Sequence, residues 1–435
     1  MPSANAPSHH DARRCAIRVI ERLRESGHTA YLAGGCVRDE LLGSAPKDYD
    51  VATDAPPDRV SMLFPRTREV GRAFGVVHVP IEGIVTEVAT FRTESSYSDR
   101  RRPDEVRFAS AEEDAHRRDF TINALFIDPL DTSERAGGRV IDYVGGRADL
   151  ESRVVRAVGD PDERLAEDDL RALRAVRFAA RLGFEIDPET AGAIRAHAGE
   201  LIGVSRERIG EEIRAVLGHP ERARGVTLIH DLRLDAVVLL MPHIDGIGTR
   251  VLDACRDDAD PMLGLAAWCA DRALALRGGD LEGLAAHLHR QAAETVRTLR
   301  TALMLSNDET ERLRDLFEGV RVVVEDWPDL RVACRKRSAS SAWFEGALEL
   351  ADAVRPDRAG AVRAEVERLA ETPGGLSPTP LVTGDDLVDS GLSPGPRFKG
   401  WLEEAYNRQL EGEIMTRDQA LSCIFAWAED EPNKG

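Results

Sequence analysis

Residues 32–50 constrain the fold of this chain more than any other stretch, because a double glycine, a helix start and two closely spaced carboxylates follow one another there. Apolar residues before Gly34 predict a short strand, and residues 48–53 predict a second strand, with one or two helical turns between them. Side chains two positions apart on a strand share a face, so we expect Asp48 and Asp50 to point the same way.

The chemistry of these residues fits a phosphate group and a metal ion. Two carboxylates on one face repel each other in low dielectric unless a cation lies between them, and hard oxygen ligands such as Asp48 and Asp50 suit Mg²⁺. Gly34 and Gly35 are expected to leave backbone N–H groups open to an anion at the start of the helix. Arg38, one turn further on, is placed to add a guanidinium to the same phosphates. Each half of the pattern alone is typical of an ordinary turn or strand end, but together they indicate a nucleotide site.

A second motif lies at residues 117–125, where two arginines precede an aspartate. Arg118 is suited to pair with a phosphate oxygen, and Asp119 is suited to accept a hydrogen bond from a ribose hydroxyl. The alternative is that the arginines are exposed charges and that Asp119 caps a helical turn. Between the two motifs, residues 64–79 and 84–92 predict further strands of one small sheet.

A third motif lies at residues 167–183, whose apolar positions have helical spacing. Asp168 and Arg171 are three residues apart, so a continuous helix would place them side by side on its surface. An Asp acceptor and an Arg donor would match the Watson–Crick edges of cytosine and adenine, whereas uracil and guanine present the opposite pattern. Mispairing of buried polar groups costs roughly 1–3 kcal/mol each, which allows discrimination without a template. The alternative is an ordinary surface salt bridge.

In their order and spacing, the three motifs resemble those of the class II tRNA nucleotidyltransferase and bacterial poly(A) polymerase family. The resemblance implies an α+β fold, in which a small polymerase-β-like nucleotidyltransferase head with a mixed sheet precedes an all-helical neck, body and tail. The implied domains are a catalytic head at 1–150, a neck with the base-selecting motif at 151–220, a body at 221–370 and an RNA-binding tail at 371–435.

The same resemblance implies roles for particular residues. Asp48 and Asp50 are expected to hold two Mg²⁺ ions, and Glu87 on a neighbouring strand is expected to be a third catalytic carboxylate. Asp168 and Arg171 are expected to select the incoming base. The nucleotide-binding set is completed by Gly34, Gly35, Arg38, Arg118, Asp119, Arg174 and Arg177.

The implied activity is template-independent addition of C, C and A to the 3′ end of tRNA from CTP and ATP, with release of pyrophosphate. A poly(A) polymerase and an enzyme that adds only the terminal A are alternatives within the class, and a catalytically silent RNA-binding protein is an alternative outside it. Bacterial poly(A) polymerases tend to be basic with a long cationic tail. This chain ends with the acidic residues 429–431, which favours the tRNA substrate.

Two glycine-containing or charged segments resemble further family motifs. Residues 92–108 are polar and without period, which predicts a mobile loop. They resemble the family's flexible loop, although Arg100 stands where glycine is usual, and that loop is implicated in the switch to adenosine. Residues 142–147 resemble the connector between head and neck. Gly145 and Gly146 there indicate either a hinge or a simple strand-to-helix turn.

Charge and cysteine content limit the partners and the compartment. The net charge of −19 argues against indiscriminate nucleic-acid binding, so a basic face must be local, with residues 100–102, 335–337 and the neck arginines as candidates. Six cysteines without metal-ligand spacing indicate reduced thiols and a cytoplasmic protein, and no apolar run is long enough to cross a membrane. His230 with Asp231 suggests a metal-dependent phosphohydrolase only weakly, because further spaced histidines are not evident. We expect an ordinary helix position there.

Overall fold

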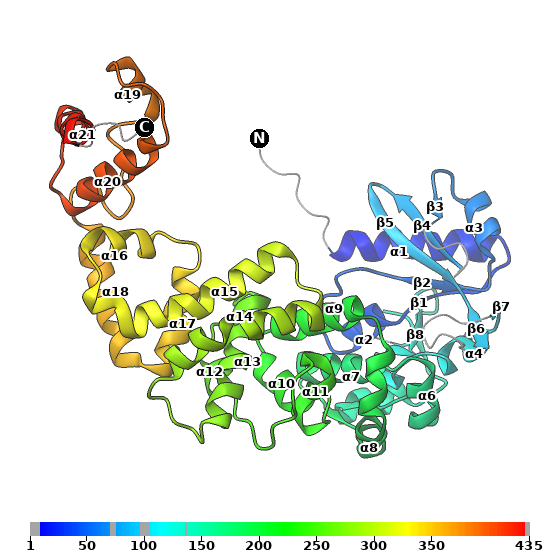
Figure 1. Ribbon diagram of the computed structural model, residues 1–435. Helices are drawn as coiled ribbons and strands as arrows, with labels where there is room; N and C mark the ends of the chain where they lie inside the picture. The colour runs from blue at the N-terminus through cyan, green and yellow to red at the C-terminus, as the bar shows by residue number, and fades with distance from the viewer. Residues whose placement is uncertain (1–8, 70–74, 96–104, 135–136, 431–435) are drawn as a thin grey trace. The chain divides into compact units, whose positions relative to one another are not determined.

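A computed structural model describes residues 9–69, 75–95, 105–134 and 137–430, and the chain falls into two compact units (Figure 1). The first unit comprises Met1–Val216 with Arg224–His243, and the second comprises Leu217–Ala223 with Ile244–Gly435. The predicted α+β fold is confirmed, because a mixed sheet precedes a helical remainder. The finer division into head, neck, body and tail stays a prediction.

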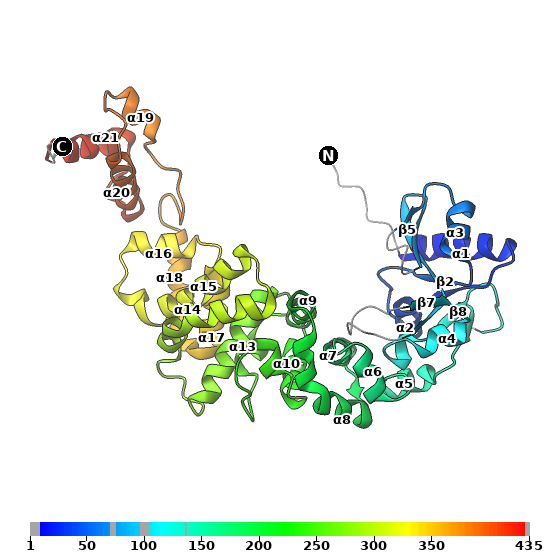
Figure 2. The same cartoon turned by 45° about the vertical axis from the view of Figure 1, so that its right-hand side comes forward.

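The sheet of the first unit has seven strands in the order β3-β4-β5-β2-β1-β8-β9. Neighbouring strands are antiparallel except β2 and β5, which run parallel, so the sheet is mixed. Helix α1 contacts the central strands and lies against the sheet in both views (Figures 1 and 2). The strands of the chain are β1 (Ala30–Ala33), β2 (Val51–Thr53), β3 (Arg68–Glu69), β4 (Val76–Ile81), β5 (Ile84–Thr90), β6 (Arg92–Ser95), β7 (Glu105–Phe108), β8 (Phe126–Asp128), β9 (Arg139–Ile141), β10 (Val154–Val155) and β11 (Glu185–Ile186).

Helices surround the sheet and complete the first unit. The apolar faces of sheet and helices meet in a core that contains Phe91 and Phe126, whose rings pack edge to face with centroids 5.9 Å apart. The helices of this unit are α1 (His9–Glu25), α2 (Gly35–Leu41), α3 (Pro57–Leu63), α4 (Ala111–His116), the 3₁₀ turn η2 (Thr121–Asn123), α5 (Gly146–Ser152), α6 (Pro161–Glu167), α7 (Arg171–Leu182), α8 (Pro188–His197), the 3₁₀ turn η3 (Ala198–Gly203), α9 (Arg206–Leu217), α10 (Arg222–Asp231) and α11 (Asp235–Leu239).

The strand that follows the double glycine is shorter than predicted. β2 begins at Val51, so Asp48 and Asp50 precede it and do not belong to it. The chain is nevertheless already beside β1 at this point, because the Ala33 N–H donates to the Asp50 carbonyl at 3.0 Å. Since Val51 pairs with Val88 in the parallel ladder, Asp50 lies next to Glu87, the residue before Val88.

Two other predicted boundaries are also wrong. Residues 92–108 are not a loop throughout, because β6 and β7 pair in an antiparallel ladder, with Arg92 opposite Phe108. The central part of that predicted loop, including Arg100, lies outside the described residues. The predicted helix over 167–183 is two helices, because Asp168 adopts an extended conformation with φ −154° and ends α6, and α7 begins at Arg171.

The glycines at the predicted connector are explained by a turn. Gly145 has a left-handed φ of +81°, and a Cβ on Gly146 would lie 2.1 Å from the Thr121 carbonyl oxygen. The Asp142 carboxylate accepts four successive backbone N–H groups, from residues 144–147, at 2.9–3.1 Å. The turn at the start of α5 therefore requires small residues for local reasons, which favours the simpler of the two predicted explanations.

The second unit is helical throughout its described part and has its own apolar interior, with Trp268 fully buried. Helices α14, α15 and α17 pack together near its centre, as Figure 2 shows. At the C-terminal end α19, α20 and α21 enclose a separate cluster that includes Leu387 and Ile424. The helices are α12 (Arg250–Ala254), α13 (Pro261–Leu276), α14 (Leu284–Leu303), α15 (Asn307–Arg321), a π-turn η4 (Val322–Asp326), a 3₁₀ turn η5 (Trp327–Asp329), α16 (Val332–Ala339), α17 (Phe344–Val354), α18 (Pro356–Ala370), α19 (Gly384–Asp389), α20 (Arg397–Glu411) and α21 (Arg417–Asp430).

One predicted basic patch is largely internal. Lys336 is 3% exposed and its ammonium donates to the Thr372 hydroxyl at 2.7 Å. Arg335 pairs with Glu365, and the Arg337 guanidinium lies over the ring of Tyr406 at 5.2 Å. The charged groups of residues 335–337 therefore contact other residues of the second unit. This differs from the expectation of a solvent-facing basic surface. Residues 100–102 lie outside the described residues.

All six cysteines are free in the structure. Among the described helices, none combines the length and the apolar character that crossing a lipid bilayer requires.

Candidate active site

One cleft of about 730 Å³ in the first unit is lined by every residue that the sequence singled out for chemistry. The lining includes the ends of β1, β2 and β5, the start of α2 and one face of α7. Segments more than a hundred residues apart in the chain therefore meet around a single cavity. The predicted residues that line it are Gly34, Gly35, Arg38, Asp48, Asp50, Glu87, Arg118, Asp119, Asp168, Arg171, Arg174 and Arg177.

Three carboxylates gather at one wall of the cleft. Burial, together with the charges of Glu87 and Asp48, raises the pKa of Asp50 to about 7, and the charge of Arg118 offsets this only in part. Glu87 remains about half exposed, with its carboxylate 3.5 Å from the His78 ring. Such a group of anions is strained by mutual repulsion, and oxygen ligands in this arrangement fit a hard divalent cation.

The double glycine forms a tight turn between β1 and α2. Gly34 has a left-handed φ of +74°, and a Cβ there would lie 2.9 Å from the Arg118 guanidinium. Its N–H donates to the Leu125 carbonyl at 3.1 Å. The prediction that this N–H stays open to an anion is therefore wrong, because the group completes the pairing of β1 with β8. The glycine is required by the turn and by the close approach of Arg118.

Arg38 is buried more completely than its predicted role requires. It is 3% exposed, and its guanidinium donates to the Asp39 carboxylate at 2.6 and 2.8 Å and to the Asn123 side chain at 2.7 Å. These contacts fix the guanidinium beside the cleft that it lines. A direct contact with phosphate stays a prediction.

Asp114, a residue that the sequence analysis missed, orients the two arginines of the second motif. One carboxylate oxygen accepts from Arg117 at 2.7 and 2.9 Å, and the other accepts from Arg118 at 3.0 and 3.1 Å. The Asp114 side chain is 2% exposed, so this ion-pair network is shielded from water. The arrangement leaves the guanidinium of Arg118 close enough to the carboxylate wall to lower the pKa of Asp50.

Asp119 is occupied by protein partners. One carboxylate oxygen accepts from the Phe120 N–H and the Asn123 amide, and the other accepts two bonds from Arg174 at 2.7 and 2.9 Å. Burial opposes ionisation, but the charge of Arg174 and these hydrogen bonds hold the pKa of Asp119 below its usual value. A carboxylate has about four acceptor positions. The geometry therefore makes Asp119 an anchor for Arg174, and the predicted contact with ribose stays a prediction.

Arg174 and Arg177 extend from α7 along the cleft. The Glu212 carboxylate on α9 accepts from Arg177 at 2.6 Å and lies 3.8 Å from Arg174. Both guanidinium groups lie over the Phe178 ring, at 5.5 and 4.7 Å from its centroid, and Arg38 lies over it at 5.1 Å. Three guanidinium groups thus surround one aromatic ring, and each of them is also held by a carboxylate.

Asp168 and Arg171 are held by separate partners and make no salt bridge with each other. The two oxygens of Asp168 accept from Arg208 on α9 at 2.7 and 3.1 Å, and one of them also accepts the Leu170 N–H. Arg171 donates to the Arg164 carbonyl at 2.6 Å and to Glu167 at 2.5 Å. The break between α6 and α7 allows both side chains to line the same cleft without pairing. The alternative prediction, a surface salt bridge between Asp168 and Arg171, is therefore wrong.

Comparison with known proteins places this geometry in a family. Residues 30–156 match the family described as "Poly A polymerase head domain", and residues 183–246 match "Probable RNA and SrmB- binding site of polymerase A". The CCA-adding enzyme of Levilactobacillus brevis is 33% identical over 417 residues, which cover 93% of this chain and 95% of that protein.

The chain belongs to the CCA-adding enzyme family.

Solved structures of the family agree with this assignment. The crystal structure of the Bacillus stearothermophilus CCA-adding enzyme in complex with CTP matches with a TM-score of 0.71 and 28% identity, covering 96% of this chain and 98% of that one. A structure of a CCA-adding enzyme with ATP matches with a TM-score of 0.68 and 18% identity over 97% and 95% of the two chains, which bears on the fold alone.

Within this family member, the sequence analysis missed the residues that hold the site residues in place. Asp114, Arg208 and Glu212 each fix a residue that the motifs had identified, and Phe178 provides the ring beneath three arginines. Arg208 and Glu212 lie on α9, outside the three motifs. Their partners lie some 35 to 40 residues away in sequence, so only the fold brings them together.

Proposed function

We propose that this protein adds C, C and A to the 3′ end of tRNA from CTP and ATP, with release of pyrophosphate. The observation that carries the proposal is the single cleft in which three carboxylates face a row of arginines and the Asp168–Arg171 pair. A nucleoside triphosphate has a metal-binding triphosphate and a base with a hydrogen-bonding edge. The cleft provides a complementary group for each of these parts.

Asp48 and Asp50 would hold Mg²⁺, with Glu87 as a third carboxylate beside them. The fit rests on the chemistry of the donors. Burial, together with the charges of Glu87 and Asp48, raises the pKa of Asp50, and a dication would stabilise the ionised carboxylates. When bound, Mg²⁺ lowers the pKa of the attacking 3′-hydroxyl and neutralises charge on the triphosphate.

The arginines of the cleft would bind and orient the triphosphate. Arg118, Arg174 and Arg177 are each fixed by a carboxylate, so their side chains are ordered before substrate arrives. Side chains that are already ordered lose little conformational entropy when the triphosphate binds, and they favour the in-line geometry that phosphoryl transfer needs.

Base selection would rest on the hydrogen-bonding capacity that Asp168 and Arg171 retain. Among the described residues, Asp168 accepts three hydrogen bonds, which leaves about one acceptor position for an exocyclic amino group. Arg171 uses three of its five N–H groups on Arg164, Glu167 and Arg117. The remaining two N–H groups can donate to the base. Cytosine would take both, at its ring nitrogen and its carbonyl, and adenine would take one, at its ring nitrogen.

Nucleotide-resolved extension of three RNAs tests the proposal: a tRNA that lacks CCA, a tRNA that ends in CC, and oligoadenylate, each with single NTPs and Mg²⁺. We expect addition to the first RNA to stop after CCA. Extension of only the second would identify an enzyme that adds the terminal A, and long tails on oligoadenylate would identify a poly(A) polymerase. No extension of any RNA would indicate a silent RNA-binding protein. The Asp48→Ala variant is the inactive control, against which any extension by the wild type is measured.

The partners and the compartment follow from the same proposal. A tRNA 3′ end, CTP and ATP are the expected substrates, and a cytoplasmic location is expected because all six cysteines are free thiols.

A further inference from the structure

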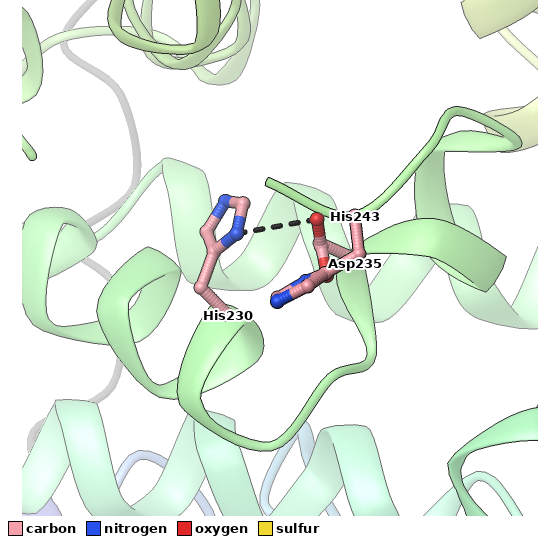
Figure 3. Close-up of side chains that lie close together, drawn as sticks. All are labelled: His230, Asp235 and His243. Carbon is pink, nitrogen blue, oxygen red and sulfur yellow. Dashed lines mark hydrogen bonds and ion pairs between the residues drawn. The ribbon is translucent and has the colours of Figure 1, made fainter. Parts of the chain in front are cut away.

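Two histidines and an aspartate meet at the end of the first unit, outside the cleft. His230 lies near the C-terminal end of α10, Asp235 begins α11, and His243 lies in the segment that follows α11. Figure 3 shows the side chains of His230 and His243 converging on the carboxylate between them. The sequence analysis treated His230 as an ordinary helix position and considered only its neighbour Asp231. The fold selects different partners.

The three side chains have the geometry of a metal-ligand set. His230 Nδ1 lies 3.2 Å from one Asp235 oxygen, and His243 Nδ1 lies 2.6 Å from the other. One ligand atom from each residue lies within 4.8 Å of the other two. Ligands of a tetrahedral Zn²⁺ at about 2.0–2.1 Å are separated by roughly 3.3 Å, so shifts of the ligand atoms by up to about 1.5 Å would close the set.

The backbone around the cluster is fixed by contacts of its own. The Arg195 guanidinium donates to the Asp231 carbonyl at 3.0 Å, and the Arg206 guanidinium donates to the Val237 carbonyl at 2.7 Å. These bonds tie the end of α10 and the length of α11 to neighbouring helices of the same unit. The backbone beside His230 and Asp235 is therefore anchored before any ligand binds, which favours selective metal binding.

The carboxylate at the centre of the cluster is buried and faces both histidines. Asp235 is 0% exposed, and each of its two oxygens faces one histidine, His230 or His243. The carboxylate is thus removed from water. A carboxylate can only accept hydrogen bonds, so Nδ1 of His243 holds a proton while it faces Asp235. A metal ion would take the place of that proton.

We propose that His230, Asp235 and His243 form a binding site for a divalent transition-metal ion, with Zn²⁺ as the best match. Two imidazole nitrogens and one carboxylate suit Zn²⁺, whereas Mg²⁺ prefers oxygen ligands alone. His230 and Asp235 are buried, while the His243 side chain is 21% exposed, so solvent reaches the set from one side. The metal would join the end of α10, the start of α11 and the segment after it, and water would complete its coordination.

This site is independent of the nucleotide cleft. Its ligands come from residues 230–243, whereas the carboxylates of the cleft come from residues 48–87. The family segment described as an RNA-binding site spans residues 183–246 and so contains the three ligands. The inference does not rest on the proposed function and would hold for an inactive protein.

Zn²⁺ titration of the chelator-treated full-length protein tests the proposal. The Asp48→Asn/Asp50→Asn variant removes two of the three carboxylates of the cleft wall and serves as the background. We expect it to bind one equivalent of Zn²⁺ with release of a proton, measured by calorimetry in two buffers of different ionisation enthalpy. Co²⁺ should give the intense visible absorption of a four-coordinate site with nitrogen ligands.

A pair of histidine variants in that background separates the cluster from other sites. His243→Gln keeps an N–H that donates to Asp235 but lacks the imidazole lone pair, and it should weaken Zn²⁺ binding by at least about tenfold. His28→Gln is the matched control, because His28 also faces a carboxylate, Asp54 at 3.1 Å, but without a second histidine. It should bind Zn²⁺ like the background. Circular dichroism checks that both variants fold.

Two results would overturn the proposal. One is the loss of stoichiometric Zn²⁺ binding in the Asp48→Asn/Asp50→Asn background. The other is equal Zn²⁺ affinity of folded His243→Gln and folded His28→Gln. If His243→Gln does not fold, the octahedral, weakly absorbing spectrum of Co²⁺ in the background protein would overturn it instead, and the four-coordinate spectrum would support it.

Discussion

Asp50 and Asp235 are both carboxylates of the first unit, yet their surroundings move their pKa values in opposite directions. Asp50 is largely buried beside two other carboxylates, and burial together with their charges raises its pKa to about 7. Asp235 lies between two histidines, and its pKa falls to about 2. The first arrangement lacks positive charge that a substrate-bound dication would supply, whereas the second already balances its anion. The groups around a carboxylate therefore separate two kinds of site. At Asp50 like charges lie close together, whereas at Asp235 the carboxylate is paired before any ligand binds.

The largest expected effect concerns Asp50 and the carboxylates of the cleft. Replacing Asp50 by Ala should lower kcat for CTP and ATP incorporation on the order of a thousandfold, about 4 kcal/mol, because the cleft loses a metal-binding carboxylate. Steady-state incorporation into a tRNA that lacks CCA measures it. Asp54→Asn is the matched control, because Asp54 follows the other end of β2 and lies outside the cleft lining. A loss of less than tenfold for Asp50→Ala would contradict the assigned role.

In chelator-treated protein, Asp50→Asn should raise stability. The folded pKa of about 7 lies above the unfolded value of 3.8, so the wild type loses stability as the pH rises from about 4 to 7. The variant removes this loss, and its gain in unfolding free energy should approach roughly 4 kcal/mol above pH 7 and vanish below pH 4. Urea unfolding at pH 4 and pH 8 measures the difference. A gain that is independent of pH would argue against a raised pKa.

Asp235→Asn should show the opposite dependence on pH in chelator-treated protein. The folded pKa of about 2 lies below the unfolded value of 3.8, so the carboxylate contributes stability above about pH 4 that is lost as the pH falls toward 2. The expected contribution is about 2 kcal/mol. Urea midpoints of the wild type and the variant from pH 6 to pH 2 should therefore converge at the acid end. Midpoints that stay apart by a constant amount would count against the paired carboxylate.

The smallest expected effect concerns Asp168, a cleft carboxylate whose partner the protein supplies. Arg208→Lys replaces two hydrogen bonds at 2.7 and 3.1 Å with a single mobile ammonium, so Asp168 loses its fixed orientation. We expect kcat/KM for CTP and ATP to fall by about tenfold, roughly 1.4 kcal/mol, and discrimination against UTP and GTP to weaken. Competition between nucleotides measures the discrimination. An unchanged preference would show that Arg208 does not position the base-selecting carboxylate.

Local sequence predicted the elements that depend on local physics. The strand before Gly34 and the helix after it are present, and strands β3, β4 and β5 lie within or overlap the predicted stretches 64–79 and 84–92, because hydrophobic spacing and a glycine turn suffice to specify them. The predicted start of the second strand at residue 48 and the predicted continuous helix through Asp168 were wrong. At both places the chain has a partner distant in sequence: the Asp50 carbonyl accepts from the Ala33 N–H, and the Asp168 carboxylate accepts from Arg208. No short window of sequence contains both members of either contact.

The sequence by itself determined which residues line the cleft, because the three motifs combine carboxylates, glycines and arginines at spacings that few other functions need. Only the tertiary structure decided what each of them contacts. Asp119 binds Arg174, the Gly34 N–H binds Leu125, and His230 meets Asp235 and His243. The physical reason is that charge and hydrogen bonding act over a few ångströms in space, whereas sequence motifs report only neighbours along the chain.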